Sequence, residues 1–199
     1  MTRTSDFIDD LGSISPIPQH AKEVFVGHIY SVWQWEQELY DGSSATYEGL
    51  KRPDTSHVVG VTPDKQILLT EDTQPNRGPV LTPPGGQIEE GESPAAAVER
   101  ELLEETGYQA KEIVPWHHYR AHTKIDWTIY AFIGRNVEPV AEAQPEPGEK
   151  ITVRLFSFDE FLELGRNINF RDRIIRTMLL EALLDPAKKE ELRTLLYGE

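Results

Sequence analysis

Three glutamates near the middle of the chain have a spacing that could hold a divalent cation. Glu101, Glu104 and Glu105 lie in the segment 93–106, which has the composition of a helix. At about 100° per residue, their carboxylates share one arc of roughly 100° on that helix. Like charges at these spacings repel one another, and a cation between them would turn this repulsion into a net attraction. Because carboxylate oxygens are hard ligands and the chain has 0 cysteines, the pattern favours magnesium or manganese over zinc.

The flanking residues predict where this helix begins and ends. Ser93 is suited to an N-cap, and Pro94 follows at the first helical position, where its missing N–H costs nothing. Gly107 is suited to a left-handed C-terminal cap. Glu92, at the junction of loop and helix, could join the acidic cluster.

The other predicted elements precede and follow this helix in the sequence. β-branched and aromatic residues, alternation and turn residues predict strands over 24–26, 29–33, 45–52, 57–62, 66–70, 125–133 and 151–158. Proline, glycine and polar residues predict loops over 71–92 and 138–150. Further helices are expected over 158–164, 172–184 and 186–196. The order of the predicted elements is strands, one helix, more strands and then helices. This order indicates a mixed sheet covered by helices.

Composition excludes several classes of protein. The chain has 199 residues, which suits one domain or one domain with a decorated terminus. Its 20 basic and 34 acidic residues give a net charge of −14, which argues against nucleic acid or an anionic membrane as the main partner. We see no secretory signal and no apolar run near the roughly 18 residues that span a bilayer, so we expect a cytoplasmic protein.

The segment 86–108 resembles the signature box of the Nudix hydrolases. The matching residues are Gly86, Glu92, Arg100-Glu101-Leu102, Glu104-Glu105 and Gly107. Tyr108 departs from the aliphatic residue that usually ends the box. The resemblance implies an α/β Nudix fold, a mixed β-sheet sandwiched between helices, with extra N-terminal antiparallel strands.

The same resemblance implies a function and a set of roles. It implies Mg²⁺-dependent hydrolysis, with Mn²⁺ as a possible substitute, of a nucleoside diphosphate linked to another group. The metal ligands that the resemblance implies are Glu101, Glu104, Glu105 and the carbonyl of Gly85. It also implies that Glu92 supports the acidic cluster and that Arg100 orients a box glutamate. The general base of many members lies in a late acidic loop, where Glu149 is the best match and Glu146 the second. Glu104, Glu105, Glu149 and Arg100 are thus the expected catalytic residues.

Two segments before the box resemble the ADP-ribose pyrophosphatase branch of that family, namely 47–53 and 74–77. On this resemblance Arg52 and Arg77 would bind the diphosphate. Trp33 or Trp35 could stack on a base, although tryptophans in strands also serve sheet packing or a dimer interface. The branch commonly carries a proline where this chain has Lys124, so another nucleotide sugar remains open as the substrate.

The expected organisation has three parts. Residues 1–22 are a flexible lead-in, 23–56 an N-terminal antiparallel β region for dimerisation and the nucleotide pocket, and 57–199 the hydrolase domain with C-terminal helices. The partners expected are a small-molecule nucleoside diphosphate derivative and a second copy in a homodimer. Two alternatives stay open: a nucleoside triphosphate pyrophosphohydrolase, and a non-catalytic nucleotide-sugar sensor on the same fold. A metal site at His117, His118 and His122 is the weaker reading of those histidines.

Overall fold

The structure, a computed structural model, describes residues 15–198. Within this range most strands belong to one mixed sheet, in which β1 to β5, β10 and β12 follow the order β1-β2-β3-β10-β4-β5-β12. β6 pairs with β5, β7 with β4, and β9 with β10, while β8 and β11 form a separate pair. The strands are β1 (Lys22–Val26), β2 (Ser31–Glu38), β3 (Ser44–Lys51), β4 (Thr55–Val61), β5 (Ile67–Gln74), β6 (Arg77–Thr82), β7 (Gly85–Gln87), β8 (Tyr108–Gln109), β9 (Glu112–His122), β10 (Ile125–Arg135), β11 (Glu138–Pro139) and β12 (Lys150–Phe156).

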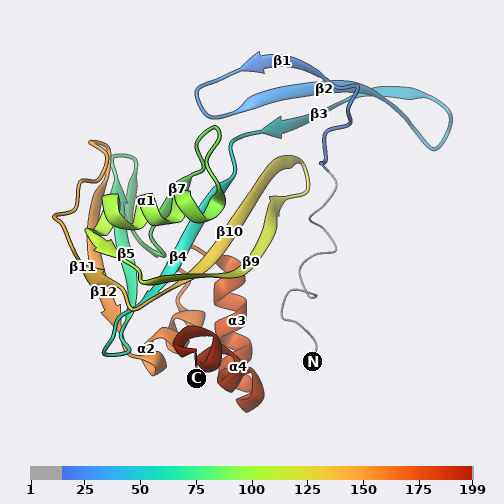
Figure 1. Cartoon of the computed structure of the whole chain (residues 1–199). Coiled ribbons are helices and arrows are strands. Elements are labelled where there is room, and N and C mark those ends of the chain that lie inside the picture. The colour runs from blue at the N-terminus through green and yellow to red at the C-terminus, as the bar shows by residue number, and fades with distance from the viewer. Residues whose placement is uncertain (1–14, 199) are drawn as a thin grey trace.

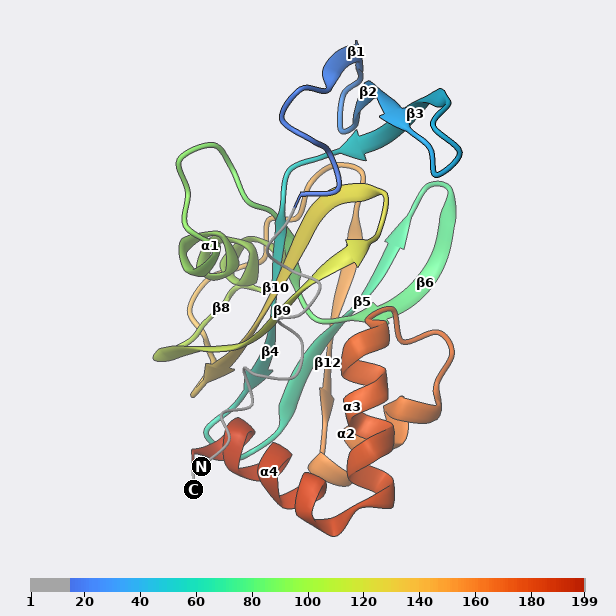
Figure 2. The ribbon, with the colours of Figure 1, turned by 90° about the vertical axis from the view of Figure 1, so that its right-hand side faces the viewer.

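Helices cover both faces of the sheet. The helix α1 (Pro94–Thr106) lies on one face, and α2 (Phe158–Glu163), α3 (Arg173–Leu184) and α4 (Pro186–Tyr197) lie on the other (Figure 2). A short 3₁₀ turn, Leu164–Arg166, joins α2 to the segment before α3. The expected helices and the helix-covered mixed sheet are therefore confirmed.

Alternation along the central strands builds the two hydrophobic layers. Val59 packs toward α2, α3 and α4, whereas its neighbour Val58 packs toward α1. Ile133 and Phe132 divide in the same way. Successive strand residues point to opposite faces, so a continuous apolar run serves a sheet that is buried on both sides.

The three N-terminal strands form an antiparallel layer that projects from one end of the molecule (Figure 1). β3 joins the main sheet through only two parallel pairs, Leu50 with Ile125 and Lys51 with Asp126. Asp41-Gly42-Ser43-Ser44 has the composition of a hairpin turn, and the chain turns there between β2 and β3. Residues 1–14 of the expected lead-in lie outside the described residues, and β1 already begins at Lys22.

The prediction of a loop over 71–92 is wrong. β5 continues to Gln74, and β6 and β7 follow within that range. Pro79 misled the prediction because proline cannot donate to a ladder. It falls in the irregularity between the pairs Asp72–Val80 and Gln74–Arg77, where its missing N–H is tolerated.

The strand β9 was not predicted, and the expected loop 138–150 contains the short β11. β9 carries Pro115 and a run of polar and histidine residues, which hide its alternation. Pro115 lies opposite Phe132, directly beside a register shift in the β9–β10 ladder. This irregularity allows a proline in a strand that pairs with β10 along most of its length.

β4 and β5 pair only at Gly60–Leu68 and Val61–Ile67, and then diverge. β6 continues the ladder on the side of β5, and β7 pairs with β4 through His57 and Gly85. β7, which carries Gly85 and Gly86, thus lies beside β4.

Candidate active site

The caps of α1 lie where the sequence places them. The Ser93 hydroxyl accepts a hydrogen bond from the Ala96 N–H at 3.1 Å, and Pro94 occupies the first turn. Gly107 adopts a left-handed conformation with φ of 74°, and its N–H donates to the Leu103 carbonyl at 2.8 Å. These caps fix both ends of the helix that carries the acidic residues.

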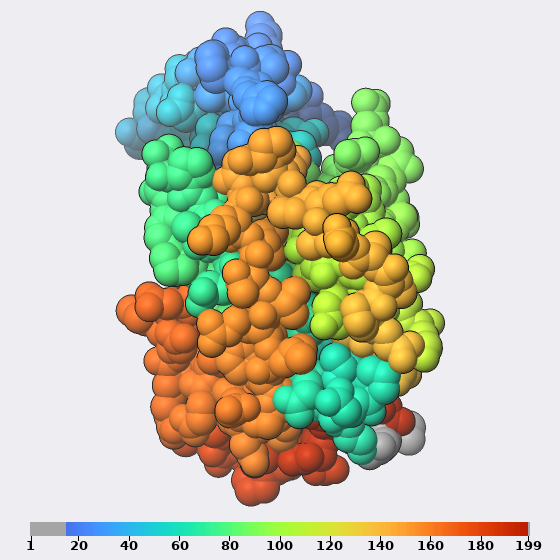
Figure 3. Space-filling view, turned by 90° about the vertical axis from the view of Figure 1, so that its left-hand side faces the viewer, coloured from blue at the N-terminus to red at the C-terminus, as the bar shows by residue number. Residues whose placement is uncertain are grey.

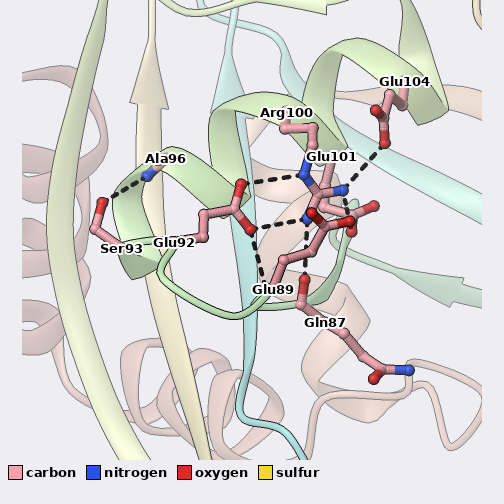
Figure 4. A network of polar contacts seen from close by, with 8 residues as sticks. All are labelled: Gln87, Glu89, Glu92, Ser93, Ala96, Arg100, Glu101 and Glu104. Carbon is pink, nitrogen blue, oxygen red and sulfur yellow. Dashed lines mark hydrogen bonds and ion pairs between the residues drawn. The ribbon is translucent and has the colours of Figure 1, made fainter.

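Arg100 connects the loop before α1 to the acidic face of the helix (Figure 4). Its Nε and Nη2 each donate to the Glu92 carboxylate at 3.1 Å, and Nη2 also donates to the Gln87 carbonyl at 3.0 Å. Nη1 donates to Glu101 at 2.9 Å and to Glu104 at 3.1 Å. The hydrogen bonds from Arg100 lower the pKa of Glu92, and those carboxylates raise the pKa of Arg100 further above its ordinary value.

The Glu101 carboxylate lies against Gly86 of β7. A Cβ atom at Gly86 would be 2.4 Å from its Oε1. Burial raises the pKa of the Glu101 carboxyl, and the carboxylates of Glu104 and Glu149 add to this, while Arg100 opposes it. The absence of a side chain at Gly86 therefore makes room for this carboxylate.

Glu105 is bound by Gly85, the neighbouring residue of β7. The Gly85 N–H donates to its Oε2 at 3.0 Å. Burial raises the pKa of Glu105 to about 9, with further contributions from Glu101, Glu149 and Asp72. The backbone hydrogen bond offsets only part of this rise. In the protein alone, this carboxyl is protonated at neutral pH, and a nearby cation would restore its charge.

The donor set around α1 fits a hard divalent cation in chemistry, with Glu101, Glu104 and Glu105 as oxygen ligands. Within residues 15–198, no group of three or more His, Asp or Glu side chains is close enough to enclose an ion as they stand. Glu101 and Glu104 instead share Nη1 of Arg100, and Glu104 is exposed. The three carboxylates thus lie on one helix face, as the spacing predicts, but their oxygens do not yet converge.

Glu149 approaches the acidic face of α1 from the loop before β12. Its carboxylate accepts a hydrogen bond from Gln74 Nε2 at 3.2 Å. Burial raises the pKa of Glu149, and the carboxylates of Asp72 and Glu146 raise it further. Of the two candidate bases, Glu149 acts on both Glu101 and Glu105 electrostatically.

The loop that carries Glu149 is attached to the C-terminal end of α1. The Gln144 N–H donates to the Glu104 carbonyl at 2.7 Å, and the Ala141 N–H donates to the Gly107 carbonyl at 3.1 Å. In the space-filling view the orange and yellow surface of this loop lies against the green surface of α1 (Figure 3). The helix and the loop therefore hold their acidic residues in one surface region.

Arg77 and Arg52 occupy different places beside this region. Arg77 forms an ion pair with the buried Asp72. The guanidinium of Arg52 lies between two aromatic rings, 4.4 Å from the centroid of Trp127 and 5.5 Å from that of Tyr30. Arg52 is thus positioned by cation–π contacts at the junction of the N-terminal strands with the main sheet.

The structure separates the two tryptophans proposed for base stacking. Trp33 and Arg52 both line a shallow surface hollow of ≈ 390 Å³. Trp35 does not line it, and packs instead near Tyr47 with ring centroids 6.1 Å apart. Only Trp33 therefore lies together with Arg52.

Asp72, Arg171 and Asp172 also lie near this region, and none of them was predicted from the sequence. Asp72 was hidden by the wrong loop prediction, although Leu68, Thr70 and Asp72 alternate toward the α1 face. Asp172 is buried and accepts a hydrogen bond from the Tyr119 hydroxyl at 3.0 Å. No local pattern predicts that Arg171 or Asp172 lies near this region, because their positions depend on how the segment before α3 returns to the sheet.

The comparison with protein families decides the identity of this fold. The model of the NUDIX domain matches residues 51–178. The chain belongs to the Nudix family. The match begins inside the N-terminal β region expected over 23–56, since it includes the end of β3.

Curated relatives of this Nudix chain include two proteins from bacilli. It is 25% identical to an ADP-ribose pyrophosphatase of Bacillus subtilis (strain 168) over 146 residues, which are 72% of this chain and 79% of that protein. It is 28% identical to a methanol dehydrogenase activator of Bacillus methanolicus over 93 residues, 46% of this chain and 50% of that protein.

A solved structure shares the fold of the Nudix chain. It is described as an ADP compounds hydrolase and has a TM-score of 0.68 at 20% identity, covering 83% of this chain and 92% of that one. The expected Nudix hydrolase, similar to the ADP-ribose pyrophosphatases, is confirmed by these matches. Nudix hydrolases generally use divalent metal cations, which agrees with the oxygen donors on α1. Within residues 15–198, no helix has both the length and the apolar character needed to cross a membrane.

Proposed function

We propose that this Nudix hydrolase cleaves the diphosphate bond of a nucleoside diphosphate linked to another group, with Mg²⁺ as its cofactor. ADP-ribose or another nucleotide sugar is the substrate, and two monophosphates are the products. The observation that carries the proposal is the buried Glu105 carboxyl, bound by the Gly85 N–H and influenced by Glu101, Glu149 and Asp72. Ionised Glu105 among these carboxylates is unfavourable in the protein alone, and a bound cation would make the ionised form favourable.

The side chains on α1 have distinct roles in this proposal. Glu101, Glu104 and Glu105, with the Gly85 carbonyl, hold the cation, and Arg100 keeps Glu101 and Glu104 directed toward one another. When bound, Mg²⁺ supplies charge neutralisation of the diphosphate and a lowered pKa of the attacking water. Mn²⁺ is a possible substitute.

Proton transfer is assigned to the loop before β12. Glu149 accepts the proton of the attacking water, because its raised pKa makes it a stronger base than an ordinary carboxylate. Gln74 orients its carboxylate through the hydrogen bond of 3.2 Å. Glu146, whose carbonyl accepts the Glu149 N–H at 2.9 Å, shapes the turn and raises the pKa of that base.

The substrate lies between this acidic region and the N-terminal strands. Arg77 and Arg52 bind the diphosphate, and Trp33 stacks on the base. This proposal assigns 23–56 to dimerisation and the nucleotide pocket, and 57–199 to the hydrolase domain. The cytoplasmic location expected from the sequence stays a prediction.

A homodimer is part of the proposal. Exposed apolar side chains gather on β1, where Phe25 is 58% and Val26 68% exposed. A second copy would remove this surface from water, which is favourable at roughly 25 cal/mol per Å². Light scattering at micromolar concentration should give the mass of two chains, and Phe25→Ser should shift it toward one. A wild-type monomer would rule the dimer out.

One assay tests the reaction. The protein is incubated with Mg²⁺ and, separately, with ADP-ribose, other nucleotide sugars, dinucleotides and nucleoside triphosphates, and the products are identified by mass. AMP and ribose 5-phosphate from ADP-ribose, abolished by EDTA and restored by Mg²⁺, are the expected result. Inorganic pyrophosphate from triphosphates alone would replace the proposal with a triphosphate pyrophosphohydrolase, and tight binding without hydrolysis would replace it with a sensor.

A further inference from the structure

A segment from the C-terminal half lies alongside β6, next to the proposed substrate region. Phe170 forms a parallel bridge with Leu81. The Leu81 N–H donates to the Asn169 carbonyl at 3.3 Å, and the Arg171 N–H donates to the Leu81 carbonyl at 2.9 Å. Residues 169–171 thus extend the sheet at the edge of β6, where β4 and β5 have diverged.

The alternation of side chains along this segment shows toward which face of the sheet Arg171 points. Phe170 and Leu81 both pack in the hydrophobic layer on the side of α3. Neighbours in an extended segment point to opposite faces, so Arg171 points toward the face of α1. Val80 lies on that face too, and its partner in the ladder is Asp72.

The charges of two other arginines, Arg77 and Arg52, act on Arg171. Its side chain is exposed along part of its surface and buried along the rest, and the nearby Asp72 carboxylate is already paired with Arg77. Lost hydration and the neighbouring charges of Arg77 and Arg52 lower the pKa of Arg171, although the carboxylates of Asp72 and Asp172 partly oppose this. Guanidinium groups close to one another repel, and an anionic ligand between them would turn this repulsion into attraction.

The neighbouring Asp172 holds the segment in place. Its carboxylate accepts the Ile175 N–H at 2.7 Å as the cap of α3, and it accepts the Tyr119 hydroxyl at 3.0 Å. Its Oδ2 is 3.4 Å from His57 Nε2 on β4. The backbone of Arg171 is therefore fixed by Leu81 on one side and by this buried anchor on the other, before any ligand binds.

We propose that Arg171 is a phosphate-binding residue, which contacts the diphosphate of the substrate together with Arg77 from the edge of β6. This inference rests on the proposed function for the identity of the substrate. It assigns a specific role to the segment before α3, which lies outside the signature box.

The test compares Arg171→Gln and Arg171→Lys with a matched control. Arg173→Gln removes the same charge two residues away, from an exposed position in the first turn of α3. Calorimetry measures the Kd of α,β-methylene-ADP, a diphosphate that resists cleavage, in the presence of Mg²⁺. Steady-state assays with ADP-ribose give kcat and KM, and thermal melting checks that each variant folds.

A lost charge-assisted contact should raise the Kd for Arg171→Gln by about tenfold or more. KM should rise more than kcat falls, and Arg171→Lys should recover part of the affinity. Arg173→Gln should change the Kd less than about twofold. Melting temperatures near that of the wild type would separate this effect from a merely structural one.

The inference is overturned if Arg171→Gln and Arg171→Lys both bind the probe as the wild type does, or if the wild type does not bind it at all. A protein that binds the probe through Arg171 but does not cleave ADP-ribose would reject the proposed function and uphold the phosphate-binding role.

Discussion

Gly86 and the carboxylate of Glu101 are so close that no side chain fits between them: a Cβ atom at residue 86 would lie 2.4 Å from Oε1 and 2.6 Å from Cδ. The same carboxylate accepts a hydrogen bond from Arg100 at 2.9 Å. The glycine before the helix thus sets the position of one acid and, through it, the arrangement around Arg100.

Gly86→Ala should therefore damage turnover more than stability. The added methyl group displaces the flexible end of Glu101, so the melting temperature should change by only about 2 °C. The value of kcat should fall by about tenfold or more, corresponding to about 1.4 kcal/mol or more. Gly78→Ala is the control, since nothing lies within 4 Å of a Cβ atom there. Equal activity of both variants would show that the close approach has no functional role.

A buried histidine should make stability depend on pH. Burial lowers the pKa of His117 to about 4 from an ordinary value of 6.5, with Asp172 opposing and His57 and His118 contributing. The unfolded chain binds this proton first, so the stabilisation is complete above pH 6.5 and is lost as pH falls toward 4. The loss reaches about 3 kcal/mol.

Urea unfolding between pH 7 and pH 4 measures this dependence. His117→Gln cannot gain the proton, so its curve should be flatter than that of the wild type. The exposed His20→Gln should keep the wild-type slope. If all three proteins lose stability in parallel, His117 is not the group responsible.

Asp172 should contribute more to stability than an ordinary helix cap. Asp172→Ala removes the cap of α3 and leaves the Tyr119 hydroxyl without its partner. Together these changes should cost about 2–4 kcal/mol of unfolding free energy. Asp185→Ala, which removes the cap of α4 at an exposed position, should cost about 1 kcal/mol. Denaturant titration followed by circular dichroism compares the two, and equal losses would contradict a special role for Asp172.

Local signals predicted the helix α1 and its acidic residues. Ser93, Pro94 and Gly107 act within one or two turns, so their effect is visible in the sequence alone. The apolar stripe of α3 and Pro186 at the start of α4 are visible for the same reason.

Contacts between distant segments could not be predicted in this way. β6 and β9 contain prolines that indicate loops, and only the bulges of their ladders explain how they remain strands. Arg171 lies beside β6 because Phe170 pairs with Leu81. These two residues are about ninety positions apart in the sequence, so no short-range pattern predicts the contact. The separate surroundings of Trp33 and Trp35 also depend on the position of the N-terminal strands, since the two residues share one face of β2.

The turnover of Glu105→Gln, compared with that of Glu99→Gln, tests the central claim most directly. Both substitutions remove one carboxylate from α1, but Glu99 is exposed, whereas Glu105 is bound by the Gly85 N–H. With ADP-ribose and Mg²⁺, Glu105→Gln should lower kcat by orders of magnitude with the fold intact, while Glu99→Gln should stay within about twofold of the wild type. Near-normal turnover of Glu105→Gln would contradict the account.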